Sequence, residues 1–110
     1  MRYSLLINAG PETRASATAL HCARAILSRG HSVFRLFFYR DGVTHATAAD
    51  PVSRDWQALI LDHGIDAVVC VGAAQRRDIE SKDVAQGFEV SGLGQLAEAM
   101  IESDRMMQFG

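Results

Sequence analysis

One cysteine near the middle of the chain lies in a pattern that could do chemistry. Cys70 lies near the end of the apolar run Ala67–Val71, Gly72 interrupts that run, and Arg76 and Arg77 follow. A cysteine is nucleophilic as its thiolate, and a helix N-terminus or a nearby cation stabilises that form. A helix that begins near Gly72 would bring both its first backbone amides and the two arginines close to the sulfur. The pattern predicts a reactive thiol at a corner between a strand and a helix.

The same residues also fit a purely structural role. Free cysteine is among the residue types that are most often buried, and Cys70 is preceded and followed by valine. The second cysteine, Cys22, lies in the middle of a predicted helix, where neither activating feature is present. The two cysteines form no CxxC or zinc-type spacing. Two free thiols rather than a disulfide are expected, which is typical of a reducing, cytoplasmic compartment.

No other pattern in the sequence predicts a catalytic or ligand site. The histidines form no HxxxH pair, and His31, His45 and His63 lie at or near predicted turns, where they are expected to be solvated. The segment 8–13 lacks the dense Ser, Thr and Gly pattern of a phosphate-binding loop, and Gly92-Leu-Gly94 is only a fragment of a dinucleotide motif. Neither a metal ion nor a cofactor is therefore expected.

Length and composition restrict the class of protein. The 110 residues are 48% hydrophobic and 22% charged, which predicts one ordinary globular domain over residues 1–110. The net charge of −2 argues against direct binding of nucleic acid, which needs a basic surface. No run approaches 18 apolar residues, and a predicted strand starts almost at Met1, which leaves no room for a signal peptide. We expect a cytoplasmic protein without membrane contact.

Strands and helices alternate along the chain at short spacing. Apolar, β-branched and aromatic runs predict strands at residues 3–9, 32–39, 67–71, 88–90 and 105–109. Amphipathic patterns predict helices from Thr13 or Ser16 to about Ser28, from Asp50 or Ser53 to Gly64, briefly after Gly72, and from Gln95 to about Ser103. Residues 44–53 are expected to be mainly loop, and residues 78–86 a helix end or a mobile loop. This alternation predicts a three-layer α/β/α domain with a mostly parallel sheet of about five strands.

Each longer helix has an apolar stripe that should face the sheet. The stripe of the first helix is Ala17, Leu20, Ala23 and Leu27, and Trp56, Leu59 and Ile60 of the second helix are predicted to face inward. The apolar residues of the last helix are Leu96, Ala99 and Met100.

Three sequence blocks resemble the TusD/DsrE family of sulfur-relay proteins, and within it the TusD group most closely. Their order and rough spacing agree from end to end. They are Phe37-Phe-Tyr-Arg-Asp-Gly-Val43, Cys70-Val-Gly-Ala-Ala-Gln-Arg-Arg77, and Ser91-Gly-Leu-Gly-Gln-Leu-Ala-Glu-Ala99 followed by Asp104-Arg105.

The resemblance implies a flavodoxin-like fold and a sulfurtransferase that carries sulfur as a persulfide on Cys70. It also implies TusB- and TusC-like subunits in a heterohexamer, a TusA-like sulfur donor and a TusE-like acceptor, with the sulfur destined for 2-thiolation of the wobble uridine in tRNA. Two alternatives stay open: a DsrE-type role in dissimilatory sulfur oxidation, and a non-catalytic assembly subunit in which Cys70 is only packed.

The chain departs from the family pattern in two respects. Family members commonly have glycine after the paired arginines, whereas this chain has Asp78, whose charge could offset part of the positive field at the thiolate. The segments between Val43 and Trp56 and between Arg77 and Gly87 also look shorter than in typical members.

Overall fold

The fold is an α/β arrangement around a five-stranded sheet in which every strand is parallel to its neighbours. The computed structural model describes residues 1–110. The spatial order of the strands is β4-β3-β2-β1-β5. Their bounds are β1 Arg2–Ile7, β2 Ser32–Phe38, β3 Asp66–Cys70, β4 Phe88–Ser91 and β5 Arg105–Phe109. The predicted α/β fold with about five strands is confirmed, and β3 lies in the interior of the sheet.

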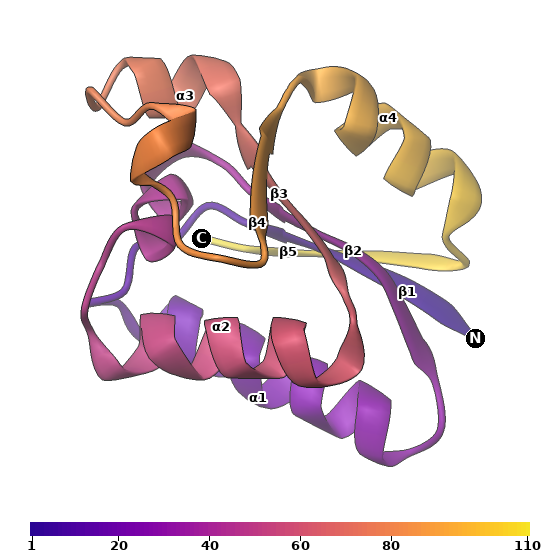
Figure 1. Cartoon of the computed structure of the whole chain (residues 1–110). Helices are drawn as coiled ribbons and strands as arrows, with labels where there is room; N and C mark the ends of the chain where they lie inside the picture. The colour runs from indigo at the N-terminus through magenta and orange to yellow at the C-terminus, as the bar shows by residue number, and fades with distance from the viewer.

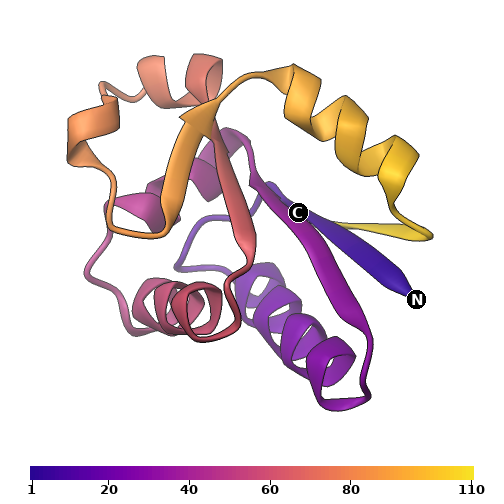
Figure 2. The same cartoon turned by 45° about the vertical axis from the view of Figure 1, so that its right-hand side comes forward.

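Helices cover both faces of the sheet. The helices are α1 Arg14–Ser28, α2 Pro51–His63, α3 Val71–Gln75 and α4 Leu93–Glu102, with 3₁₀ turns η1 Arg40–Ala46 and η2 Ser81–Asp83. Figure 2 shows α1 and α2 on one face and α4 on the other, so that the sheet forms the middle layer. The chain returns from β4 at one edge to β5 at the opposite edge through α4. None of the helices has the length and apolarity needed to cross a bilayer.

The core lies mainly between the sheet and the α1–α2 layer. Alternate strand residues point to opposite faces, so Leu36 and Phe38 of β2 share the face toward α1 and α2. Phe38 contacts Trp56 of α2 edge to face, with ring centroids 5.7 Å apart. Trp56 is completely buried, and Leu59 and Ile60 are buried beside it, as predicted.

The helix boundaries follow the local capping chemistry. Thr13 caps α1 by accepting a hydrogen bond from the Ser16 amide, and Asp50 caps α2 by accepting one from the Val52 amide. Gly64 ends α2 with φ of 61°, in the left-handed region that glycine adopts without steric cost. Two possible starts were predicted for both α1 and α2, and in each helix the earlier one, Thr13 or Asp50, is confirmed.

Two details of the element prediction are wrong. Residues 40–46 form η1, so the start of the predicted loop is helical. In α1 the buried face is rotated, because Ala19 and Ile26 are buried whereas Ala17 and Leu27 are only partly covered. Of the apolar residues of α4, Ala99 is completely buried, whereas Met100 is 62% exposed. When several positions around a helix are similarly apolar, the sequence does not determine how the helix is rotated about its own axis. That rotation is set by packing against the sheet.

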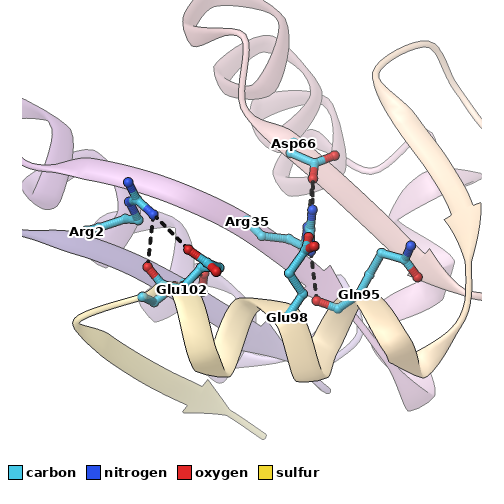
Figure 3. A network of polar contacts seen from close by, with 8 residues as sticks. Arg2, Arg35, Asp66, Gln95, Glu98 and Glu102 are labelled. Carbon is cyan, nitrogen blue, oxygen red and sulfur yellow. Dashed lines mark hydrogen bonds and ion pairs between the residues drawn. The ribbon is translucent and has the colours of Figure 1, made fainter.

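A buried arginine fixes α4 to the sheet (Figure 3). Arg35 of β2 is 8% exposed, and its Nη2 lies 2.6 Å from Asp66 of β3. Its Nη1 donates to the Gln95 carbonyl and to Glu98, both at 2.8 Å. Burial by itself lowers the pKa of the guanidinium, but the hydrogen bonds and charges of Asp66 and Glu98 outweigh burial, and the pKa is raised. Arg35 therefore stays charged and joins β2, β3 and α4.

Candidate functional site

Cys70 lies at the carboxyl edge of the sheet, at the end of an interior strand. It is the last residue of β3 and the N-cap residue of α3, so the predicted strand-to-helix corner is confirmed. In the β3–β4 register its neighbour is Ser91, the last residue of β4. Figure 1 shows β3 leading into α3 and β4 leading toward α4 at the same edge. The carboxyl ends of parallel strands are where α/β proteins usually bind their ligands.

The Cys70 side chain is buried and makes no hydrogen bond. Its residue is 4% exposed, and its side chain makes no capping hydrogen bond to α3. Cys70 is the N-cap residue of α3, and backbone amides at the start of a helix have no partner within the helix. Val71 is 39% exposed and Leu93 is 52% exposed. Cys70 is therefore buried, whereas Val71, the next residue, and Leu93, at the start of α4, are exposed apolar residues.

The two arginines after α3 have different roles. Arg77 donates to the Ala73 carbonyl of α3 at 3.0 Å and to the Asp41 carboxylate of η1 at 2.7 Å. Arg77 therefore clamps α3 onto η1. Arg76 is exposed and forms no ion pair, so it is the arginine that remains available to solvent or to a partner.

The Arg77–Asp41 pair gives a test of how the α3 corner controls access to the thiol. Asp41 is 71% exposed, so the pair contributes at most about 1 kcal/mol. If the pair holds the corner closed, Asp41→Ala should raise the alkylation rate of Cys70 up to about fivefold. The rate is measured with a maleimide in a Cys22→Ser background. Lys82→Ala, which breaks the exposed pair with Glu80 and leaves the capping box of η2 intact, is the matched control and should not change the rate.

Asp78 occupies a position that demands a left-handed backbone. Its φ is 57°, and the Ile79 amide donates to the Ala74 carbonyl while the Asp78 amide donates to the Gln75 carbonyl. These two bonds form a Schellman-type turn that follows the Arg76 cap of α3, with Asp78 at its left-handed position, where glycine is preferred. The motif gives the physical reason why glycine suits this position, and Asp78 is here a turn residue.

His45 is not solvated, and the prediction for it is wrong. It is 1% exposed. Its Nε2 donates to the Ala9 carbonyl at 3.1 Å, since a carbonyl only accepts, and Nε2 is also 3.1 Å from the Ser16 hydroxyl. Nδ1 therefore accepts from the Ser53 hydroxyl at 3.1 Å in the neutral ring. His45 joins the end of β1 to α1 and α2, so it supports the fold beneath the carboxyl edge.

The buried His45 predicts a stability that declines in mild acid. Burial lowers the pKa of His45, and the Ala9 hydrogen bond and the charges of Asp50 and Glu12 oppose that effect only in part. The unfolded chain then binds a proton more readily than the folded protein does. Stability is therefore complete above the unfolded pKa of about 6.5 and is lost as the pH falls below it, by at most about 1.4 kcal/mol per pH unit.

Urea unfolding between about pH 7.5 and pH 5 measures this slope. His45→Gln should flatten it, even though the variant is less stable overall. His63→Gln, at an exposed position at the end of α2, is the control. A slope that His45→Gln leaves unchanged would show that other groups cause the acid sensitivity.

Cys22 is remote from the Cys70 corner. It lies on α1, is partly exposed, and its thiol is 3.6 Å from the sulfur of Met107 on β5. Burial raises the pKa of the Cys22 thiol, which disfavours the reactive thiolate. The structure does not bring the two cysteines together as a disulfide.

The structural roles of Asp41 and Arg35 were not predicted from the sequence. Asp41 is in one of the resembling blocks, but nothing in the sequence shows that it meets Arg77, 36 residues away. Arg35 had a usable signal, because it is a charged residue inside the apolar strand Ser32–Phe38. A buried arginine needs a carboxylate partner, and Asp66 at the start of the next strand supplies one.

Comparisons with known proteins agree with this geometry. The sequence matches the model of the DsrE/DsrF-like family over residues 1–109. It is 40% identical to a DsrE protein of Allochromatium vinosum, with 100% of this chain and 99% of that protein covered. It is also 40% identical to the sulfurtransferase TusD of Erwinia tasmaniensis, with 99% and 100% covered. The crystal structure of the ychN protein from E. coli has the same fold, with a TM-score of 0.88, 18% identity and 99% of each chain covered.

Both sequence alignments span 129 positions, more than the 110 residues of this chain, so these relatives contain residues that it lacks. Which segments are shorter stays a prediction. At 40% identity to both proteins, the comparison does not separate the TusD type from the DsrE type. The predicted relationship to sulfurtransferases is confirmed. The chain belongs to the DsrE/DsrF-like family.

Proposed function

We propose that this protein is a sulfurtransferase that carries sulfur as a persulfide on Cys70. The Cys70 thiolate attacks the terminal sulfur of a donor persulfide, and a new sulfur–sulfur bond forms while the donor leaves as its thiolate. The product is Cys70–S–SH. An acceptor thiolate then attacks the outer sulfur, and Cys70 leaves as a thiolate. The two steps together involve no net oxidation and need no cofactor.

The observation that carries the proposal is the position of the Cys70 thiol. It lies at the carboxyl end of β3, next to the first amides of α3, without a hydrogen-bond partner of its own at that helix end. Partial positive charge at a helix N-terminus stabilises a thiolate, both before attack and when Cys70 leaves in the second step. Membership of a family with relatives named sulfurtransferases supports the same role.

For the route of the sulfur we propose the one that the resemblance of the three sequence blocks implies. In the TusD-type version, a TusA-like protein donates, a TusE-like protein accepts, and the sulfur is used for 2-thiolation of the wobble uridine in tRNA. The chain would act in the cytoplasm as one domain over residues 1–110, within a heterohexamer with TusB- and TusC-like subunits. Its slightly negative net charge suits a protein that hands sulfur to other proteins and does not itself hold tRNA.

A second candidate function follows from the low exposure of Cys70. A residue that is 4% exposed and lies in an apolar strand also fits a packed, inert thiol in a non-catalytic assembly subunit. The two candidates differ in the reactivity of the folded protein. A sulfur carrier reacts at Cys70 faster than at Cys22, whereas an assembly subunit reacts slowly and equally at both.

Stepwise transfer tests the proposed route. The protein is mixed with a persulfide-loaded TusA-like protein, separated from it, and then mixed with a TusE-like protein, and the mass of each partner is measured. Sulfur that reaches the TusE-like protein only through the loaded chain supports the proposal. A chain that never gains sulfur contradicts it. Restoration of 2-thiouridine in a strain without TusD distinguishes the TusD-type role from the DsrE-type role, in which loading occurs but tRNA thiolation is not restored.

A further inference from the structure

A groove at the other end of the molecule has no part in the proposed sulfur chemistry. It lies between α1 and the strands β1 and β5, toward the amino ends of the strands, whereas Cys70 lies at their carboxyl ends. Its volume is about 370 Å³, within the range of small-molecule sites. Most of its lining is apolar or sulfur-bearing, from Tyr3, Cys22, Ala25, Ile26 and Met107.

Two nitrogen-bearing side chains complete the lining, Arg29 and His31. Arg29 forms no ion pair and no side-chain hydrogen bond, unlike Arg24 one turn earlier, which lies 3.7 Å from Asp55. The carbonyls at the end of α1 do not compete for Arg29, because the amides of residues 29, 30 and 31 already donate to them. The Arg29 guanidinium is therefore an available, bidentate donor at an apolar groove.

His31 adds a second donor. Its Nδ1 is 2.9 Å from the backbone nitrogen of Met1, which can only donate, so Nδ1 is the acceptor. The hydrogen of the neutral ring is then on Nε2, which has no partner within the protein. The ring is held in place by an edge contact with Tyr3, with centroids 5.7 Å apart.

We propose that this groove binds a small monocarboxylate with an unbranched aliphatic chain, a medium-chain fatty acid. The carboxylate pairs with Arg29 and accepts a hydrogen bond from His31, and the chain lies along Ile26 and Met107. A guanidinium pairs with a carboxylate through two parallel hydrogen bonds. One guanidinium and one ring N–H match the few acceptors of a carboxylate better than the more numerous oxygens of a phosphate. Flexible methionine and a protonated thiol are suitable neighbours for an alkyl chain.

Octanoate, below its micelle concentration, is the probe. Calorimetry with the full chain gives its affinity, and peptide mass spectrometry gives the alkylation rate of Cys22 and Cys70 with and without it. We expect octanoate to slow the alkylation of Cys22 but not that of Cys70. Arg29→Ala should lower the affinity for octanoate at least about tenfold, because a charge-assisted contact is lost. Arg24→Ala, on the same helix, should leave the affinity unchanged.

Octanol and inorganic phosphate test separately the alkyl chain and the anionic group of the proposed ligand. Both should bind at least about tenfold more weakly than octanoate, since each lacks one half of it. The proposal is overturned if octanoate does not slow the alkylation of Cys22. It is also overturned if Arg24→Ala weakens octanoate binding as much as Arg29→Ala does, or if octanol or phosphate binds as tightly as octanoate. Because the groove lies away from Cys70, none of these results depends on whether the protein transfers sulfur.

Discussion

Replacement of Cys70 by serine should reduce sulfur uptake from a persulfide donor by about a thousandfold or more, because the attacking atom is lost. A serine hydroxyl is not ionised at neutral pH and forms no stable persulfide. The overall fold should be preserved, since serine is similar to cysteine in size and Cys70 makes no capping hydrogen bond to α3. Uptake is measured as the initial rate of sulfur transfer from a loaded donor protein.

Cys22→Ser is the matched control for this experiment. Cys22 lies on α1, away from the carboxyl edge of the sheet, and should not take part in transfer. The variant should load sulfur at the rate of the unmodified protein. Transfer that survives in Cys70→Ser and disappears in Cys22→Ser would move the reactive thiol to the other cysteine and would refute the assignment.

Replacement of Gly42 by alanine should lower the free energy of unfolding by about 3 kcal/mol, the upper end of the usual cost of overpacking. Gly42 belongs to η1, which lies against the end of β1. A Cβ at this residue would be 1.9 Å from the Ile7 carbonyl oxygen and 2.9 Å from its carbon. Both atoms belong to the backbone, so η1 or β1 has to move. The free energy is measured by urea unfolding.

Gly94→Ala is the control for the Gly42 prediction. A Cβ at Gly94 meets nothing within 4 Å, and the residue lies within α4. Alanine is the better helix former by about 1 kcal/mol, so this variant should be as stable as the original protein or slightly more stable. Equal stability of Gly42→Ala and the original protein would mean that η1 does not lie this close to β1.

The sheet could be predicted because its signals are local. The run Ala67–Val71 is too short for a helix and rich in valine, and the helices between the strands leave only a parallel arrangement. The strand order could not be predicted, because β4 and β5 are both short and neither sequence indicates with which strand it pairs. That residues 1–110 form one domain stays a prediction.

The place of Cys70 in the fold could be predicted, but its surroundings could not, and its role as the reactive residue stays a prediction. The corner at Cys70 could be read from a strand that ends before Gly72. The clamp between Arg77 and Asp41 and the burial of His45 depend on contacts between segments far apart in the sequence. A histidine beside turn residues is usually solvated, and only the packing of α1 and α2 over η1 removes His45 from water.

Mass spectrometry of the protein after exposure to a persulfide donor shows whether Cys70 carries sulfur. Intact mass counts the sulfur atoms gained, and the mass of the cysteine-containing peptides, after the persulfide is trapped by alkylation, locates them. We expect one additional sulfur per chain, located on Cys70 and absent from Cys22, and we expect it to be lost when a thiol acceptor is added. No gain of mass, or sulfur located on Cys22, would contradict the proposed role of Cys70.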